Sequence, residues 1–444
     1  MRNQLFSRSL SRRRFLKNAG GTLVGASLLP KVVAGVLAPS EIVRAQAADP
    51  PPNLYFAGTD GWIYLPPDPP ISFYFPDNYA PPPLNAYIFG FRNITGLDST
   101  QIGKQKMKAQ HSAPMFWVDQ YNGSNEFRVQ LTNLGLQMRP DLTDSHTLHW
   151  HGFRNVIPYF DGEPTGSISV PIGRNFTYVF RPRDPGTYMY HCHVEDVEHV
   201  HMGMTGPVFV RPLQNGNTSL YASGKYVYND GDGSTGYDRE FVMFLSEFWA
   251  EAHWADAHIQ LPDWSDYHAD FSLLNGRVYP DTLAPNGSID PFNPVRDSNG
   301  DLISPAGHPE LQYQPLSALV TCQPEERVLL RFINLGFREA SMTLAGIRMR
   351  VIGRDATLMR GRDGADTSYE TNTILIGPGE SFDCIFTAPA HSGGSGPDKY
   401  VLHNRRLTQV SNLSTGGAGG QRTEVHLYPR GSLSAQQYPN EWGL

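Results

Sequence analysis

Cysteine is scarce in this chain, with only three among 444 residues. Charge is also sparse, because Asp, Glu, Lys and Arg together make up 18% of the sequence and the formal net charge is −7. An acidic balance argues against a nucleic-acid partner. Beyond residue 48, no apolar run is long enough to span a bilayer. We therefore expect a mature protein that is soluble, does not cross a membrane and does not bind nucleic acid.

Turn-forming and aromatic residues are abundant instead, with 43 Gly, 36 Pro, 23 Phe and 21 Tyr. This composition favours many short strands and turns over long helices. Residues 127–132 and 176–180 alternate between apolar and polar side chains, as half-buried strands do. With 444 residues the chain is long enough for two or three domains. The predicted fold class is all-β.

The first 47 residues are predicted to be an export signal rather than part of the fold. Residues 11–17 resemble the twin-arginine signature, an apolar run follows over 19–38, and the small residues 45–47 fit a cleavage site. Twin-arginine export carries proteins that have already folded. We expect a periplasmic or extracellular location.

The remainder contains an internal duplication. Residues 328–336 echo 128–135, residues 379–386 echo 173–180, and residues 400–403 echo 188–191. The predicted organisation is a first domain over 48–213, a linker over 214–237, a second domain over 238–430 and a tail over 431–444.

Two stretches of the first half carry most of the chemistry. Residues 146–152 read HTLHWHG and residues 188–204 read YMYHCHVEDVEHVHMGM. A thiolate and two imidazoles in a plane, with a weak axial thioether, form a blue-copper site. The candidates for these four ligands are Cys192, His146, His199 and Met204.

The other histidines form pairs with the spacing H-x-H: His149 with His151, and His191 with His193. On an extended strand, residues i and i+2 point to the same face. Each pair can therefore present two imidazoles to one metal cluster. Cys192, between His191 and His193, points to the opposite face, so one short strand serves both sites.

These motifs resemble the copper-binding signatures of the multicopper oxidases, the laccase-like family. The resemblance implies two cupredoxin-like Greek-key β-barrel domains, with a type 1 copper in the first. His149, His151, His191 and His193 then correspond to ligands of the type 2 and type 3 coppers. Asp161, in YFDGEPT, resembles an acidic residue near the oxygen-binding cluster. The implied activity is oxidation of a phenolic or metal-ion reductant with reduction of dioxygen to water.

The spacer between His193 and His199 departs from the family pattern, because VEDVE is two residues longer than usual. His201 is therefore an alternative to His199, which is preferred because its spacing to Gly203 and Met204 is kept. The insertion also carries Glu195, Asp196 and Glu198. Carboxylates near a blue copper would favour cationic donors, although a solvated acidic turn is the simpler interpretation.

The second half lacks the copper motifs. Asn404 and Arg405 stand where Cys192 and His193 stand in the first half, and alignment of Gly346 with Gly152 puts non-histidine residues at the other ligand positions, namely Ala340, Thr343 and Ala345. Half of the family's paired histidines are thus absent, so we expect a homo-oligomer or an incomplete cluster. Either two first domains face each other across a two-fold axis, or a neighbour's second domain supplies histidines, with His253 and His258 as candidates.

Two other functional classes remain open. A copper nitrite reductase also has two cupredoxin domains, but it would be expected to have a single His before the Cys and no H-x-H pairs. A non-catalytic copper carrier needs only the blue-copper site. The remaining cysteines, Cys322 and Cys384, are predicted either to form a disulfide after export or to be buried free thiols.

Overall fold

The computed structural model describes residues 50–414 and 417–444. The predicted export signal over residues 1–47 lies outside the described residues. Among the described residues, no helix combines the length and apolar character needed to cross a membrane. Residues Pro52 to Leu444 form one compact unit, so the domain limits drawn from the sequence remain predictions.

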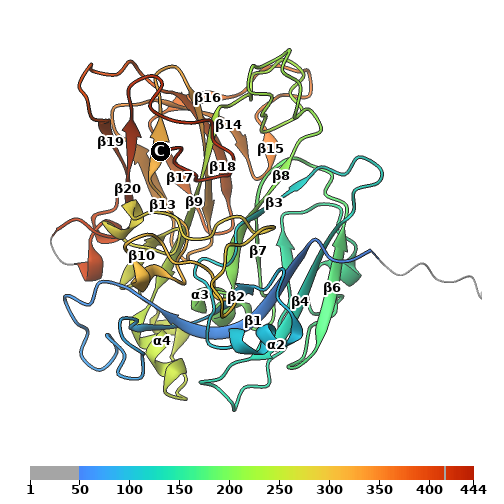
Figure 1. Cartoon of the computed structure of the whole chain (residues 1–444), viewed down its shortest axis with the longest axis vertical. Helices are drawn as coiled ribbons and strands as arrows, with labels where there is room; N and C mark the ends of the chain where they lie inside the picture. The colour runs from blue at the N-terminus through green and yellow to red at the C-terminus, as the bar shows by residue number, and fades with distance from the viewer. Residues whose placement is uncertain (1–49, 415–416) are drawn as a thin grey trace, which may run out of the picture. The chain divides into compact units, whose positions relative to one another are not determined.

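The strands of the first half form two four-stranded sheets, which make the first barrel (Figure 1). One sheet has the order β2-β1-β4-β6, from β1 (Leu54–Ile63), β2 (Ala86–Asn93), β4 (Phe127–Gly135) and β6 (Asn175–Phe180). The other has the order β3-β8-β7-β5, from β3 (Phe116–Asp119), β5 (His149–His151), β7 (Gly186–His191) and β8 (Thr205–Arg211).

The strands of the second half form the second barrel, whose later strands are orange to red in Figure 1. Its larger sheet has the order β10-β9-β12-β18-β14-β15, with β16 beside β14. These strands are β9 (Arg239–Phe248), β10 (Phe271–Leu274), β12 (Arg327–Asn334), β14 (Met349–Arg354), β15 (Thr357–Leu358), β16 (Tyr369–Thr371) and β18 (Ser381–Thr387). The smaller sheet has the order β11-β20-β19-β13-β17, from β11 (Val320–Cys322), β13 (Ala340–Leu344), β17 (Thr373–Ile376), β19 (Asp398–Asn404) and β20 (Arg422–Leu427).

The duplication seen in the sequence is present in the strand pairing. β1 runs parallel to β4, and β9 runs parallel to β12. The side-chain amide of Asn133 donates to the carbonyl of Val170, and that of Asn334 donates to the carbonyl of Ile376. The all-β, cupredoxin-like fold predicted from the sequence is therefore confirmed.

Each barrel encloses its own core of buried apolar side chains. Burial alternates along β4 from Phe127 to Gly135, as the sequence predicts. The first core contains Cys192 and Met204 among its aromatic and aliphatic side chains. Full burial of one such large apolar side chain contributes about 1.5–3 kcal/mol to folding, so the barrel is a rigid support for these two residues.

Within residues 50–414 and 417–444, helices are few and short. They are α2 (Ser99–Ile102), α3 (Asp196–Met202) and α4 (Ala250–Ala257). Single 3-10 turns occupy Gly103–Gln105, Pro158–Phe160, Trp264–Asp266, Asp281–Leu283, Pro309–Leu311, Leu407–Gln409 and Asn412–Ser414. Both α3 and α4 pack against β2, which brings these two helices to the same strand of the first barrel.

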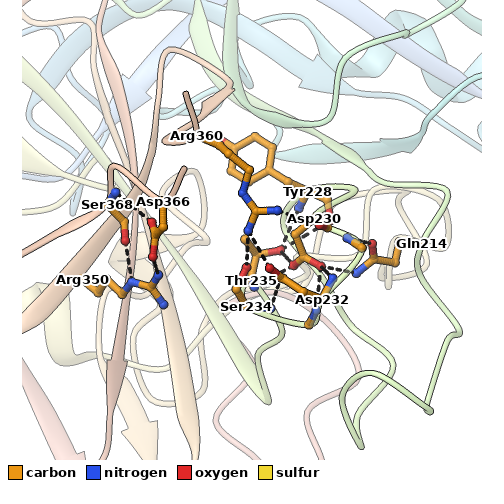
Figure 2. A network of polar contacts seen from close by, with 12 residues as sticks. Gln214, Tyr228, Asp230, Asp232, Ser234, Thr235, Arg350, Arg360, Asp366 and Ser368 are labelled. Atoms are coloured by element: carbon orange, nitrogen blue, oxygen red, sulfur yellow. Dashed lines mark hydrogen bonds and ion pairs between the residues drawn. The ribbon is translucent and has the colours of Figure 1, made fainter. Parts of the chain in front are cut away.

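The predicted linker is an ordered part of the structure. Tyr226 and Tyr228 are buried, and the loop that follows is held by a network of polar contacts (Figure 2). Arg360 donates to the carbonyl of Asp230 at 2.9 Å and to the carboxylate of Asp232 at 2.8 Å. The linker is therefore attached to the second barrel.

The segment over 431–444, predicted to be a tail, bonds to the second barrel. The Asn440 side chain accepts from the backbone N–H of Val242 at 2.8 Å, and Gln436 accepts from the N–H of Glu240 at the same distance. The C-terminal segment thus satisfies backbone groups along β9, which sequence patterns alone do not reveal.

The two remaining cysteines are free and buried. Cys322 lies in β11 and Cys384 in β18, which belong to different sheets. Burial raises the pKa of the Cys322 thiol to about 12 and raises that of Cys384 as well. Of the two alternatives left open by the sequence, the structure contains the buried free thiols.

Candidate metal centre

Cys192 lies in the core of the first barrel with two histidines beside its sulfur. The Sγ atom is 3.3 Å from Nδ1 of His199 and 4.0 Å from Nδ1 of His146. All three side chains are fully buried, and their ligand atoms lie within 4.8 Å of one another. The structure thus brings together three of the four predicted blue-copper residues, from segments far apart in the sequence.

Backbone hydrogen bonds connect the fourth residue, Met204, to this group. The N–H of Cys192 donates to the carbonyl of Met204 at 3.0 Å, and the N–H of Met204 donates to the carbonyl of His199 at 2.9 Å. The N–H of Thr147 lies 3.4 Å from the Cys192 sulfur. The Met204 side chain is fully buried in the same core as Cys192.

Two of these buried side chains, Cys192 and His199, shift each other's protonation. Burial opposes the charged forms, but the attraction between the Cys192 sulfur and the imidazoles outweighs it. The pKa of His199 rises to about 10, and the pKa of the Cys192 thiol falls well below its usual value. The site therefore favours the thiolate, which is the form that ligates metals.

Helix α3 is the local structure that the VEDVE insertion forms, and it sets the position of His199. Glu195 precedes the helix in a left-handed conformation, with φ of 47°. Gly203 ends it at φ of 121°, where a Cβ atom would lie 2.7 Å from both His111 Nδ1 and the carbonyl of Phe89. Only glycine fits there. The helix is thus closed at a residue that no other amino acid can replace without strain.

His201 points away from Cys192. Its Nε2 accepts a hydrogen bond from the N–H of Trp249 at 3.1 Å, and its ring packs against Trp264, Tyr267 and Phe337. Of the two histidines that the sequence left as alternatives, His199 is the one that lies beside the Cys192 sulfur.

The four remaining predicted histidines gather around one cavity of about 380 Å³ that is open to solvent. His149 pairs with His191 across β5 and β7, which places the two rings 5.1 Å apart. The His193 ring is 4.8 Å from His149, and Nδ1 of His151 is 3.4 Å from Nε2 of His191. The two H-x-H pairs therefore face one space, on the side of the strand opposite to the Cys192 sulfur.

Burial keeps three of these imidazoles neutral, those of His149, His151 and His191. It lowers the pKa values of His149 and His151, and it lowers that of His191 to about 3. The Nδ1 atom of His191 lies 2.8 Å from the carbonyl of Cys192, which leaves Nε2 on the cavity side. Neutral imidazoles with a free ring nitrogen are the form that binds metal.

Asp161 contacts the His149 ring chiefly through its backbone carbonyl. Its carbonyl oxygen lies 2.8 Å from Nδ1 of His149, whereas its carboxylate lies 3.7 Å from the same nitrogen. Burial raises the pKa of the Asp161 carboxyl. Gly162 follows it at φ of 75°, where a Cβ atom would lie 2.2 Å from the carbonyl of Leu148. The orientation of the His149 ring thus depends on the carbonyl of Asp161.

The second barrel forms one wall of the same cavity. The lining residues from that barrel are Leu335, Gly336, Phe337, Pro378 and Gly379. A Cβ atom on Gly379 would lie 3.3 Å from Nε2 of His151, so this turn passes close to the histidines. The wall contains no histidine.

Asp144, which the copper-binding motifs do not include, also belongs to the blue-copper region. Its carboxylate is 3.6 Å from Nε2 of His199, and neither atom has a hydrogen-bond partner. Asp144, Glu195 and His199 offer ligand atoms within 4.8 Å of one another. One sequence signal could have identified Asp144 as a candidate. Asp144 lies two residues before His146, so the two side chains point to the same side of an extended segment.

The positions of the second barrel that correspond to His149 and Cys192 carry other residues, as the sequence predicts. Thr343 pairs with His403 as His149 pairs with His191. The Asn404 side chain replaces the Cys192 thiol, and it donates to Gln409 and Gln421 at 2.8 Å each. An uncharged amide network therefore fills the place of the blue-copper ligands.

His253 and His258 do not present ligands to a neighbour. His253 is 1% exposed, and its Nδ1 lies 2.6 Å from the carbonyl of Tyr87. His258 is stacked between Tyr79 and Trp254, with its Nε2 3.1 Å from the carboxylate of Asp77. The suggestion that they complete a neighbour's cluster is wrong, because their packing already engages both rings.

The residues present fit copper at both places. A buried thiolate with two imidazoles and a nearby methionine is the donor set of a type 1 site, and it surrounds the Cys192 sulfur here. His149, His151 and His191 form a second group whose ligand atoms lie within 4.8 Å of one another.

Comparison with known sequences gives a consistent result. Residues 113–215 and residues 239–423 each match a family model described as multicopper oxidase. The chain is 24% identical over 278 residues to the multicopper oxidase MmcO of Mycobacterium tuberculosis, covering 62% of this chain and 47% of that protein. It is 26% identical to Laccase-15 of Oryza sativa subsp. japonica (56% and 34% covered) and 26% identical to L-ascorbate oxidase of Nicotiana tabacum (55% and 37% covered). The match spans less than half the length of each of these relatives.

Solved structures share the fold. A blue copper oxidase from Nitrosomonas europaea superimposes with a TM-score of 0.54 at 18% identity, covering 87% of this chain and 88% of that one. The multicopper oxidase mgLAC gives a TM-score of 0.55 at 20% identity, covering 86% and 88%. With both barrels matched by the family models and the histidine motifs gathered as those motifs predict, this chain belongs to the multicopper oxidase family.

Proposed function

We propose that this protein is a copper-dependent oxidase that takes single electrons from a reductant at the Cys192 site and reduces dioxygen to water at the histidine cavity. Copper, when bound, supplies the one-electron redox chemistry. His146, Cys192, His199 and Met204 would hold the type 1 ion. His149, His151, His191 and His193 would hold the copper that meets dioxygen.

The observation that carries the proposal is the sharing of three consecutive residues between the two sites. Cys192 faces His146 and His199, while His191 and His193 on either side of it face the cavity. An electron that leaves the sulfur therefore has only a few covalent bonds to cross before it reaches a cavity histidine. A copper carrier needs only the blue-copper ligands and has no use for the cavity histidines.

The test combines copper content, spectroscopy and oxygen uptake on the wild type and a Cys192→Ser variant. Wild-type protein should bind several coppers per chain, show an intense thiolate-to-copper absorption band and consume oxygen with a phenol or a reduced metal ion. The variant should lose the band and the uptake. About one copper per chain without oxygen uptake would support a carrier instead, and nitrite consumption would support a reductase.

The reductant is proposed to deliver electrons at the edge of His199 that faces Asp144. Both facing atoms, His199 Nε2 and Asp144 Oδ2, are buried without a hydrogen-bond partner, and Glu195 adds a second carboxylate. Two carboxylates at the entry point attract cations, so we favour a reduced metal ion over a phenol. Asp196 lines the histidine cavity instead. The acidic insertion therefore places one carboxylate near the blue-copper site and another at the histidine cavity.

Steady-state kinetics with manganous ion, cuprous ion and a phenol would separate these reductants. An Asp144→Asn, Glu195→Gln double variant should raise the KM for the metal ions and leave the KM for the phenol unchanged. Asp196→Asn is the matched control, because it removes one charge from the same insertion on the cavity side. Equal effects on metal ions and phenol would refute the assignment.

The active form is proposed to be a homo-oligomer in which a second copy closes the cavity. The chain supplies four of the eight paired histidines that the family resemblance implies. Val197, which lines the cavity, is 50% exposed. Ile157 and Tyr159, in the segment that leads to Asp161, are 56% and 50% exposed. Exposed apolar groups around an incomplete site are typical of an interface.

Sedimentation of copper-loaded protein would test the assembly. A Val197→Glu, Tyr159→Glu variant should sediment as a monomer, keep the blue colour and lose oxygen uptake. Leu407→Glu is a suitable control, because Leu407 is 83% exposed in the second barrel. A monomeric wild type with full oxygen uptake would contradict the proposal.

Export by the twin-arginine route is also proposed, on the residues 11–17 alone. An Arg12→Lys, Arg13→Lys variant should accumulate inside the cell, whereas the wild type should be recovered outside the cytoplasmic membrane. Equal distribution of the two would exclude this route.

A further inference from the structure

A group of stacked and edge-packed rings lies outside both copper-binding sets. We call it the aromatic cluster, and its members are His201, Trp249, Trp264, Tyr267 and Phe337. The His201 ring is 5.5 Å from Trp264, 5.2 Å from Tyr267 and 5.3 Å from Phe337 between centroids. Trp249 is 5.6 Å from Trp264 and 5.7 Å from Tyr267. The rings therefore form a continuous chain of contacts.

The aromatic cluster reaches toward both copper-binding sets and toward the surface. His201 lies in α3, two residues after His199. Phe337 lines the histidine cavity, and its ring is 5.0 Å from that of Tyr267. His268, whose side chain is 56% exposed, packs 5.4 Å from Trp249. The aromatic cluster thus connects the cavity wall to the surface through neighbouring rings.

Tyr267 differs from the other members because it has a proton acceptor beside it. Its hydroxyl donates to Oε2 of Glu247 at 2.5 Å. Glu247 is 3% exposed, and the same oxygen accepts from the N–H of Phe337 at 2.8 Å. The other oxygen has no hydrogen-bond partner and lies 4.0 Å from Nε of Arg338. A short hydrogen bond to a carboxylate holds the phenol in one orientation.

This arrangement favours loss of an electron together with the proton. Burial, and then the charge of Glu247, raises the pKa of the Tyr267 phenol, so it does not ionise beforehand. Removal of an electron alone would leave a cation in surroundings that solvate charge poorly. Transfer of the proton along the existing hydrogen bond to Glu247 avoids that charge.

We propose that Tyr267 is a redox-active residue and that Glu247 is its proton acceptor. A one-electron oxidant, such as a ruthenium(III) photo-oxidant, takes one electron from Tyr267 and is itself reduced by one electron, while the phenol proton moves to Glu247. Copper held in either copper-binding set would be the partner with which Tyr267 exchanges electrons in the loaded protein. The products on this chain are a neutral phenoxyl and a protonated carboxyl. An external one-electron reductant then restores the phenol, and Glu247 returns the proton.

Such a residue would store an extra electron beside a cavity to which this chain contributes only four histidines. That use in oxygen reduction rests on the proposed function. The redox activity of Tyr267 itself does not, because the ring contacts and the hydrogen bond to Glu247 belong to the chain alone.

Photo-oxidation of the full copper-loaded chain would test the inference. A ruthenium photo-oxidant in solution is flashed, the sample is frozen, and the paramagnetic resonance spectrum is recorded with ordinary and with ring-deuterated tyrosine. The wild type should give a neutral tyrosyl signal that narrows on deuteration. Tyr267→Phe should lose this signal while it keeps the blue band and the copper content.

Two further variants make the test specific. Tyr221→Phe is the matched control, because the Tyr221 hydroxyl donates to Asp238 at 2.6 Å in the same kind of pair, far along the chain from the aromatic cluster. It should keep the full signal. Glu247→Gln leaves the Tyr267 ring in place and removes the acceptor, so the signal should be lost at neutral pH. This variant carries the test if Tyr267→Phe does not fold.

An undiminished signal in Tyr267→Phe would overturn the assignment, and so would an equal loss in Tyr221→Phe. An undiminished signal in Glu247→Gln would overturn the role of the carboxylate. Failure of the proposed function would show differently, as absent oxygen uptake in a wild type that still forms the tyrosyl signal.

Discussion

The two barrels share a strand plan but differ in what occupies one position. In the first barrel, Cys192 follows β7 and places its sulfur beside two imidazoles. In the second, Asn404 ends β19 and places an amide between Gln409 and Gln421. In both barrels the buried polar side chain at this position has polar partners. Only the first leaves donor atoms that favour a soft metal, so the fold tolerates either chemistry at this position.

The same comparison extends to the cavity side. Gly152 and Gly346 have φ of 86° and 83°, and a Cβ on either would lie 3.4 Å from the following tyrosine ring, Tyr188 or Tyr400. The backbone is thus retained where the histidines are not. His403 keeps the ring position of His191, with Nδ1 2.7 Å from the next carbonyl. The second barrel therefore keeps the backbone geometry of a copper site but only one of its ligand side chains, His403.

The largest effect is expected from removal of one cavity histidine. His191→Ala should abolish oxygen uptake, because the cavity loses a ligand that His149 and His151 both adjoin. The blue band should remain, since Cys192, His146 and His199 are unchanged. His403→Ala is the matched substitution in the second barrel, and it should alter neither oxygen uptake nor the blue band. Oxygen-uptake rates and the visible spectrum would check both, and loss of uptake in His403→Ala would break the comparison.

Much of the first barrel could be predicted, because its signals are local. The strand alternation over 127–132 and the H-x-H spacing identify side chains that share a face, and they need no knowledge of distant residues. The contact between Asp144 and His199 could not be predicted from the sequence, because His199 lies on helix α3. The position of that helix relative to Asp144 depends on the fold. Glu247 and Tyr267 meet only through the packing of β9 against a later turn. Contacts of that kind depend on the whole fold.

The second largest effect is expected at the amide network. Asn404→Ala should destabilise the chain by about 1–3 kcal/mol for each buried polar group left without a partner. Its side chain bonds to Gln409 and Gln421 and accepts from the backbone N–H of Ser341 and Arg406. Urea unfolding followed by fluorescence would measure the loss. Copper content and the blue band should not change, and a parallel loss of colour would mean that the barrels depend on each other.

Acid should destabilise the seam where the barrels meet. Burial lowers the pKa of His111 to about 4, against an ordinary value of 6.5, and its Nε2 lies 3.4 Å from Ser246 of the second barrel. A histidine whose folded pKa is depressed contributes stability above pH 6.5 that is lost as the pH falls toward 4. The unfolding free energy should therefore decrease by about 1.4 kcal/mol per pH unit for this residue.

Denaturant unfolding at several pH values would measure that slope. His111→Gln should flatten it, because the variant removes one group that only the unfolded chain protonates. The same copper loading in both proteins isolates the contribution of His111. An identical slope in the variant would show that other groups carry the acid sensitivity.

The smallest effect is expected where the linker joins the second barrel. Arg360 bonds to the linker loop through the Asp230 carbonyl, the Asp232 carboxylate and the Ser234 hydroxyl (Figure 2). Asp232 is half-exposed, and exposed ion pairs contribute little, so Arg360→Ala should cost about 1 kcal/mol. Arg350 is the matched control, because it bonds to Asp366 and Ser368 within its own barrel. If the linker only connects the barrels, both variants should keep wild-type oxygen uptake. Loss of uptake in Arg360→Ala but not in Arg350→Ala would mean that the linker loop fixes the turn over the histidine cavity.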